Sequence, residues 1–399
     1  MNGALRKTNF IPGNTVRISR SGGEFFEHLC HIIRTARYEI HIQTYIWEPD
    51  ETGTEISRLL MEATARGVSV YLVLDAFGSG RIRKNKEWLR AWHDAGIRFR
   101  FFGEPLAGKN LNIGRRMHHK FVIVDGRRTI VTGRNIADRY NKMPKHDAWL
   151  DFAAFVDGPV AVHLRRIALL FWPRAQRFRI PVFPEWIELS PLGDVPVKIA
   201  RNDFFRGIYE MYNSYLDVFE RAESDITAVA AYFLPGRRMR MALQHAAGRG
   251  ARIRLLFSRY SDVPLANYAT QYLYNWLIRS GVEIYEWYSS IVHGKVAVVD
   301  QKWATVGSYN LNYLSALESV ELNYIFWDEK VADELRTMIN SIMEEESEKI
   351  RAEKYNKNHS LLRQFKEWAA FVIFRSLLRI LLFFGGRHKS IPDKVEEEI

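Results

Sequence analysis

Two short segments of the chain carry the same four polar residue types at the same spacing. Each has a histidine, a lysine two positions later, an aspartate five positions after the lysine and an asparagine 17 positions after the histidine. The residues are His118, Lys120, Asp125 and Asn135 in the first segment and His293, Lys295, Asp300 and Asn310 in the second. Imidazoles can serve as nucleophile and general acid, and lysines supply positive charge for a phosphate. The pattern therefore indicates phosphate chemistry.

The spacing also predicts how these side chains are presented. Residues i and i+2 of a strand share a face, so each motif histidine points the same way as its lysine. If the two copies pack with a pseudo-twofold relation, two histidines and two lysines converge on one pocket. A single copy could be a surface pair or a buried structural histidine. A metal site is disfavoured because ammonium groups repel cations.

The motifs lie inside a longer internal repeat. The segment MHHKFVIVD (117–125) resembles VHGKVAVVD (292–300), and ATARGVSVYLVLD (63–75) resembles AAGRGARIRLLFS (246–258). Matched positions are 175 to 187 residues apart, which makes each copy the size of a domain. We expect one domain over 1–190, a second over 191–345, and a segment 346–399 formed by a charged helical linker (Glu344–Lys357) and a C-terminal helix.

The first copy alternates helical and strand patterns. Apolar residues recur at three- and four-residue spacing in Glu24–Arg37, which predicts a helix, and Tyr38–Trp47 has the pattern of a strand. Thr54–Arg66 is predicted as a second helix ended by a glycine, and Val68–Leu74 as a buried strand. The sequence thus predicts an α/β fold, with a mixed sheet flanked by helices in each copy.

Composition limits the function. The chain has 399 residues, of which 47% are apolar, which excludes a disordered protein. Its single cysteine, Cys30, can form neither an internal disulfide nor a cysteine-rich zinc site. The 57 Lys and Arg residues against 46 Asp and Glu residues favour a polyanionic partner, either nucleic acid or an anionic lipid surface.

One long apolar stretch stands near the C-terminus. Trp368–Phe384 is interrupted by Arg375 and Arg379, and a spanning helix needs about 20 apolar residues with few charges. We expect an amphipathic helix that lies in the membrane interface, with basic residues near its ends. Those residues are Arg363, Lys366, Arg387 and Lys389. The alternative is a helix that packs on the protein's own core.

The paired motifs resemble those of the phospholipase D superfamily. The resemblance extends from about Val16 to Trp327 and includes QTYIW (43–47) and TGRNIADRY (132–140). The combination is similar to bacterial cardiolipin synthases, particularly the form without N-terminal membrane-spanning helices. The resemblance implies two tandem phospholipase D-like domains related by pseudo-twofold symmetry.

The resemblance also implies roles for the motif residues. One histidine attacks the phosphorus to form a phosphohistidine while the other protonates the leaving alcohol, and the roles then reverse. By analogy His118 is the nucleophile and His293 the acid and base, an assignment that the sequence itself does not make. The residues implied to hold the non-bridging phosphate oxygens are Lys120, Lys295, Asn135, Asn310 and Ser308.

Four acids accompany the motifs. Asp151 and Glu321 occupy the family's downstream acid positions, and we expect them to orient the histidines; each could instead be an ordinary surface acid. Asp125 and Asp300 complete the catalytic motif, and we expect them to brace its turns rather than to touch substrate.

The first copy departs from the family at one point, with Thr132-Gly133 where two glycines or Gly-Ser are usual. A threonine there could tighten the phosphate half-site. The neighbouring Arg134 could add charge to the site or point to solvent.

The implied activity is the transfer of a phosphatidyl group between two phosphatidylglycerol molecules, giving cardiolipin and glycerol, with no metal or organic cofactor. The alternatives are phospholipase D-type hydrolysis, a nuclease or phosphodiesterase of the same chemistry, and a non-catalytic lipid-binding scaffold. We expect an anionic phospholipid as substrate and no nucleic acid partner. We also expect a peripheral location on the cytoplasmic side of a bacterial cell membrane. The oligomeric state stays open, since the duplication already supplies both motifs.

Overall fold

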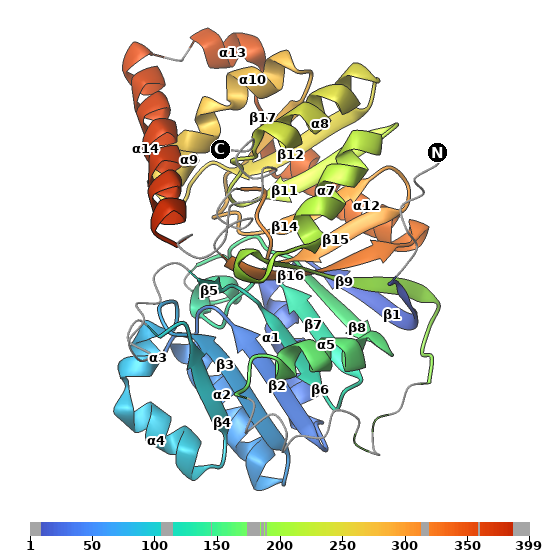
Figure 1. The fold of residues 1–399 in the computed structure, drawn as a ribbon, viewed down its shortest axis with the longest axis vertical. Coiled ribbons are helices and arrows are strands. Elements are labelled where there is room, and N and C mark those ends of the chain that lie inside the picture. Colours follow the sequence, from blue (N-terminus) through green and yellow to red (C-terminus); the bar gives the residue numbers. More distant parts are fainter. Residues whose placement is uncertain are drawn as a thin grey trace. The chain divides into compact units, whose positions relative to one another are not determined.

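The chain folds into two compact units, which we describe one at a time. The computed structural model describes residues 9–104, 115–144, 146–173, 184, 187, 190–312, 319–357 and 360–385. Unit 1 consists of Met1–Arg201 with Val306–Ser308 and Val320–Trp327, and unit 2 of the remaining residues (Figure 1). Two short segments of the second repeat therefore belong to unit 1.

Unit 1 is a seven-stranded mixed sheet between helices. Its elements are β1 (Ile11–Ser19), α1 (Gly22–Arg34), β2 (Glu39–Thr44), α2 (Glu51–Ala65), β3 (Ser69–Asp75), α3 (Gly80–Lys84), α4 (Lys86–Asp94), β4 (Arg98–Phe102), β5 (Arg116–Met117), β6 (Phe121–Val124), β7 (Arg128–Thr132), η1 (Asp138–Tyr140), β8 (Ala153–Asp157), α5 (Val160–Leu169), most of β9 (Val195–Asp203) and most of β16 (Ser319–Trp327). The strand order β4-β3-β2-β6-β7-β8-β1 has a parallel half, β2 to β4, and an antiparallel half.

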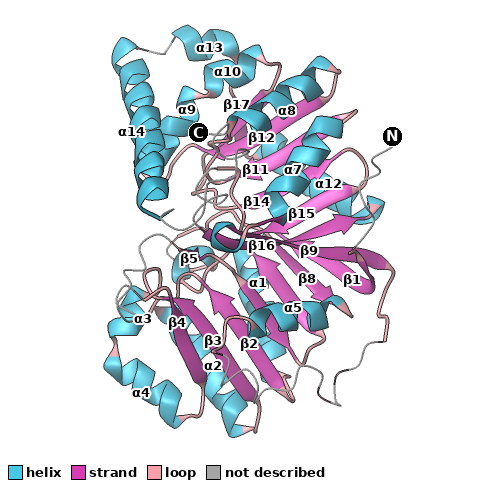
Figure 2. Cartoon of the chain, in the orientation of Figure 1, coloured by secondary structure: helices cyan, strands magenta, loops and turns pink. Residues whose placement is uncertain are grey.

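Strand β2 is buried on both faces, and β3, for which the sequence pattern predicts this burial, is buried in all but its first residue. Ile40 and Ile42 of β2 join a core with α1, α2 and β3. The intervening side chains point the other way, and Gln43 there donates to the carbonyl of Ala168 on α5. Figure 2 shows the helices on the two sides of the strands. The sheet is thus held between α1 and α2 on one face and α5 on the other.

Unit 2 repeats this plan. Its elements are η2 (Phe204–Arg206), β10 (Ile208–Tyr209), α7 (Glu210–Arg221), β11 (Asp225–Ala230), α8 (Arg237–Gly248), β12 (Arg252–Ser258), α9 (Pro264–Tyr272), α10 (Tyr274–Arg279), β13 (Glu283–Trp287), β14 (Lys295–Val299), most of β15 (Trp303–Gly307), α12 (Glu329–Glu345), β17 (Ser347–Lys349), α13 (Ala352–Lys357) and α14 (Leu361–Gly385). Strands β11, β12 and β13 are parallel, and β14 pairs antiparallel with β11. Helix α12 packs against β11, β13 and β14.

The two sheets have matching pairings. In unit 1, Ile40 pairs with Val70 of the next parallel strand and with Val124 of the motif strand. In unit 2, Ile226 pairs with Ile253 and Val299 in the same way. The prediction of a mixed α/β fold with a duplicated sheet is confirmed.

The expected elements agree with the structure apart from their ends. The helix expected at Glu24–Arg37 begins two residues earlier because Ser21 caps it, its side chain accepting from the backbone N–H of Glu24. The helix expected at Thr54–Arg66 begins at Glu51 because Asp50 caps it in the same manner. The linker Glu344–Lys357 is not one helix, because its residues 347–349 form β17 along the edge of β13.

Helix α14 lies along α9 in unit 2, and Figure 1 shows the two side by side. The rings of Tyr272 and Phe371 are 4.7 Å apart at this contact. The expected basic residues Arg387 and Lys389 lie outside the described part of the chain. Within the described residues, no helix combines the length and the apolar character that crossing a bilayer requires.

Candidate active site

The first motif occupies the segment between β5 and β6, where it meets strand β16. The backbone N–H of His118 donates to the carbonyl of Val320 over 2.9 Å. This bond brings the first motif beside a strand that lies more than 200 residues later in the chain, although both belong to unit 1.

Glu321 of β16 holds the ring of His118. Both carboxylate oxygens lie 2.9 Å from Nδ1 of the histidine. The Glu321 side chain is fully buried, whereas that of His118 is 16% exposed. Because an ionised carboxylate can only accept, Nδ1 is the ring nitrogen that donates to Glu321. The contact therefore fixes the orientation of the His118 ring.

The neighbouring histidine is a core residue. His119 is buried, and its Nδ1 lies 3.0 Å from Oε1 of Gln43. Burial lowers its pKa to about 3. Of the two adjacent histidines, only His118 therefore combines an acid partner with exposure.

Each motif lysine folds back onto its own histidine. Nζ of Lys120 donates to the carbonyl of His118 over 2.9 Å, and Lys295 donates to the carbonyl of His293 in unit 2. Nζ of Lys295 also lies 2.9 Å from Nδ1 of His293. The other three residues, Lys120, His293 and Lys295, are at most 6% exposed. Residues 118–120 lie between β5 and β6 and not within a strand, so the contact of Lys120 is with the backbone of its histidine, whereas in unit 2 the two side chains meet.

Tyr45 belongs to the site although the sequence analysis did not assign it a role. Its ring meets that of His118 edge to face at 5.1 Å, and Nζ of Lys120 lies 5.4 Å from its centroid. Burial raises its pKa to about 12, so the phenol is neutral at physiological pH. Tyr45 directly follows β2. Its position at the end of a parallel strand is the sequence signal that could have identified it as a site residue.

Asp75 is a second residue that the sequence analysis missed. It ends β3 and is fully buried. Its carboxylate accepts from the backbone N–H groups of Phe77, Gly78 and Met117, the residue before His118. Burial raises its pKa despite these bonds. Asp75 therefore fixes the backbone from which the first motif starts.

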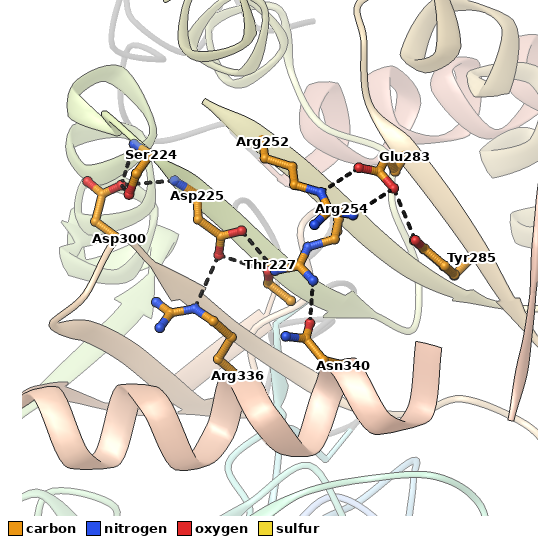
Figure 3. Close-up of polar contacts among 10 residues, drawn as sticks. All are labelled: Ser224, Asp225, Thr227, Arg252, Arg254, Glu283, Tyr285, Asp300, Arg336 and Asn340. Atoms are coloured by element: carbon orange, nitrogen blue, oxygen red, sulfur yellow. Dashed lines mark hydrogen bonds and ion pairs between the residues drawn. The ribbon is translucent and has the colours of Figure 1, made fainter. Parts of the chain in front are cut away.

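The motif aspartates tie the turns after β6 and β14 to the strand next to each. Asp125 has a φ of +52° and accepts from the backbone N–H groups of residues 37, 38 and 39. Asp300 has a φ of +49° and accepts from residues 223, 224 and 225 (Figure 3). Both aspartates adopt the left-handed conformation, which aspartate tolerates better than most residues, and their bonds hold the two turns in the same way.

A charged network lies next to Asp300. Figure 3 shows Asp225 directed toward Arg254 on β12 and Arg336 on α12. The corresponding acid of unit 1, Glu39, pairs with Arg165 on α5. In each copy, an acid at the start of the corresponding strand, β2 or β11, thus contacts an arginine on a following helix, α5 or α12.

The asparagines and the serine are buried. The amide of Asn135 accepts from the backbone N–H of Ile46 over 3.0 Å and donates to the hydroxyl of Tyr140 over 2.9 Å. The hydroxyl of Ser308 donates to the carbonyl of Leu322 and accepts from its N–H. Asn310 in unit 2 is 4% exposed. In unit 1, these side chains bond the motif turns to neighbouring backbone.

The Thr132-Gly133 departure has a structural use. The Thr132 hydroxyl donates to the carbonyl of Phe152 over 2.7 Å, so it faces the protein interior. A Cβ at Gly133 would lie 2.4 Å from Oδ1 of Asp151, which is too close, so the carboxylate would have to shift. Asp151 itself is fully buried. Glycine at 133 is therefore what allows this carboxylate to approach the turn.

Arg134 does not point to solvent. It is 1% exposed, and Nη2 donates to the carbonyls of Arg20 and Asp151. Burial lowers its pKa to about 10, which leaves it charged at neutral pH. The charge of Arg134 therefore lies inside unit 1, against the backbone of Asp151.

No group of three or more His, Cys, Asp and Glu side chains in the described ranges is arranged to hold a metal ion.

Comparison with known proteins identifies the family. The family model described as "Cardiolipin synthase, PLD-like domain" matches residues 29–150 and 215–343, which is more than half of the chain and one segment from each copy. This chain belongs to the cardiolipin synthase family of phospholipase D-like enzymes.

Individual relatives agree with this assignment. The chain is 30% identical to cardiolipin synthase B of Escherichia coli (strain K12) over 346 residues, which cover 84% of this chain and 82% of that protein. It is 28% identical to the major cardiolipin synthase ClsA of Bacillus subtilis (strain 168) over 333 residues, 82% of this chain and 68% of that protein.

Solved structures show the same fold. Phosphatidylserine synthase of Haemophilus influenzae superposes with a TM-score of 0.72 over 94% of this chain and 98% of that one, at 13% identity. Polyphosphate kinase of Porphyromonas gingivalis superposes with a TM-score of 0.57 over 92% of this chain and 53% of that one, at 12% identity. The architecture is therefore shared by proteins whose sequences have diverged far from this one.

Proposed function

We propose that this enzyme joins two phosphatidylglycerol molecules into cardiolipin and releases glycerol. The observation that carries the proposal is the contact between His118 and Glu321, because a carboxylate there fixes the orientation of the imidazole. The relatives named cardiolipin synthase support the choice of reaction. The formal net charge of +11 suits an anionic lipid substrate.

In the first proposed step, Nε2 of His118 attacks the phosphorus of one phosphatidylglycerol. A P–N bond forms while the P–O bond to the glycerol headgroup breaks, and His293 gives a proton to the departing oxygen. Glu321 stabilises the positive charge that develops on the phosphorylated ring. The products of this step are glycerol and a phosphatidyl-histidine.

In the second proposed step, the neutral His293 removes a proton from the headgroup hydroxyl of another phosphatidylglycerol. That oxygen attacks the phosphorus and the P–N bond breaks, which restores His118 and releases cardiolipin. Lys120 and Lys295 neutralise the non-bridging oxygens, and the chemistry needs no metal or organic cofactor. Asn135, Asn310 and Ser308 support the same oxygens, and Asp151 is proposed as the second orienting acid.

We further propose that the enzyme works as a peripheral protein on the cytoplasmic side of a bacterial cell membrane, without a nucleic acid partner. This location fits the supply of phosphatidylglycerol. Helix α14, with its outward apolar side chains, supports it.

The test is to incubate the purified full chain with phosphatidylglycerol vesicles and to follow the lipids by mass spectrometry. Cardiolipin and glycerol in equal amounts, absent with His118→Ala and with His293→Ala, are the expected result. Phosphatidic acid as the product would mean that the enzyme hydrolyses the lipid instead of transferring its phosphatidyl group. Cleavage of DNA with no lipid turnover would agree with the proposed histidine chemistry but would show that the proposed substrate is wrong.

A further inference from the structure

A groove in unit 2 is lined by none of the motif residues. It has a volume of about 770 Å³ and lies among α9, the paired strands β13 and β17, and the start of α14. We call it the α9–α14 groove. The side chains that matter for its chemistry are Arg259, Tyr260, Tyr268, Lys349, Arg351 and Lys366.

The groove is predominantly basic, since five Lys and Arg side chains line it against two glutamates. Three of the basic groups are paired. Arg259 contacts Glu286 and Glu348, Lys349 contacts Glu283, and Arg363 contacts Glu367.

Arg351 and Lys366 are the two cations of the groove that have no acidic partner among the residues that the structure describes. They come from different walls, Arg351 from the segment after β17 and Lys366 from α14. Both residues are exposed and line the same groove, and a guanidinium and an ammonium are groups that bind phosphate-like anions.

The groove opens beside an apolar stripe on α14. The helix turns Ala370 and Glu367 toward the protein, where they are 3% and 1% exposed. Its outer side carries large apolar side chains with exposures from 39% to 82%. They are Leu361, Leu362, Phe365, Trp368, Val372 and Ile373. Spacings of three, four and seven residues place them along one side of the helix.

Stripe and groove are continuous, because Leu362 belongs to both and Lys366 follows one helical turn later. Tyr260 and Tyr268, which also line the groove, are 57% and 38% exposed. A large exposed apolar surface normally contacts a partner, and one flanked by tyrosine, tryptophan and lysine suits the interface of a bilayer. The ligand that offers an anion directly beside apolar chains is an anionic phospholipid.

We propose that the α9–α14 groove binds the phosphate headgroup of an anionic phospholipid in the bilayer through Arg351 and Lys366, while the α14 stripe lies against its acyl chains. This lipid is held as an anchor and not as the substrate. The inference adds a second lipid site to the proposed function, and it can be tested without any turnover.

The experiment is flotation of the full-length protein with phosphatidylcholine vesicles that contain or lack phosphatidylglycerol. We compare the wild type with a double variant, Arg351→Ala with Lys366→Ala. The matched control is Lys86→Ala with Arg90→Ala, which removes the same charges from exposed positions of α4. Since each basic residue near an anionic surface contributes about 1 kcal/mol, the groove variant should bind about thirty-fold more weakly and the control nearly as the wild type.

Further results decide the proposal. Phe365→Ser with Trp368→Ser should weaken binding to the same vesicles, and phosphatidylglycerol turnover in detergent micelles should persist in the groove variant. Equal binding by groove and control variants would overturn the proposal. Complete competition by soluble glycerol phosphate would overturn the role of the bilayer and leave a site for free phosphate esters. Failure of the proposed reaction would appear as lost turnover with vesicle binding intact.

Discussion

Replacement of Glu321 by glutamine tests the central contact of the site. The side chain is fully buried and touches Nδ1 of His118 with both oxygens at 2.9 Å. Glutamine has the same shape but no charge. It can accept from Nδ1–H through its oxygen, or it can turn its NH₂ group to Nδ1, which forces the ring proton onto Nε2 and blocks the nucleophile.

The size of the effect follows from the bond that is weakened. A hydrogen bond to a charged group contributes about 1.5–3 kcal/mol and a neutral one about 0.5–1.5 kcal/mol. The difference grows in importance as the ring of His118 becomes positive on attack, since only a carboxylate stabilises that charge. A loss of about 2 kcal/mol in the transition state lowers kcat about thirty-fold, and the wrong tautomer lowers it further.

The assay is the initial rate of cardiolipin formation at saturating phosphatidylglycerol, with the melting temperature measured on the same sample. Tyr324→Phe is the matched control. Tyr324 is a buried residue of the same strand, and its hydroxyl contacts Thr129 at 2.8 Å instead of the histidine. We expect it to lose about 1 kcal/mol of stability and to keep its kcat. A Glu321→Gln enzyme with wild-type kcat would refute the orienting role of this acid.

Three other predictions address the site and its support. Gly133→Ala should lower kcat at least about tenfold, because the added Cβ would displace the Asp151 carboxylate. Gly80→Ala is the control and should leave kcat unchanged, because a Cβ at position 80 meets no atom within 4 Å. Tyr45→Ala should lower kcat about fivefold, because it removes the ring that packs on His118. Tyr45→Phe keeps the ring and should have the wild-type kcat. Steady-state kinetics of the two variants checks this prediction. Burial would raise the pKa of Glu39, but neighbouring cationic groups lower it to about 2. The contribution of the Glu39 carboxylate to the stability of the fold is therefore complete when the pH is above the ordinary pKa of 4.5. It is lost as the pH falls toward 2. Denaturant titrations at a series of pH values should show this loss in the wild type and a smaller one in Glu39→Gln.

Local signals were sufficient to predict much of the fold. The apolar periodicity of α1 and α2 and the buried run of β3 depend only on neighbouring residues, so their existence could be predicted and only their ends differed. The cap at Asp50 shows why the ends differ, since a side chain that accepts a backbone N–H extends the helix beyond its apolar pattern.

The support of the site could not be predicted in the same way. The pairing of His118 with Glu321 joins residues 203 positions apart, and no local pattern indicates which acid approaches which histidine. Arg134 illustrates the opposite error, because an arginine in a turn ordinarily faces water, yet this one is buried against the backbone of Asp151. Tyr45 has no motif of its own and acquires its place only through the end of its strand.

The position of β16 has a consequence for how this protein can evolve. The strand is encoded in the second repeat but folds with the first, and it brings Glu321 to the histidine there. A gene split between the repeats would produce a first half whose histidine has lost its acid, and a second half with an unpaired strand edge. Separation of the two repeats would therefore take Glu321 away from His118, so the first motif depends on the second repeat even though the motif turns differ in sequence at Thr132 and Gly307.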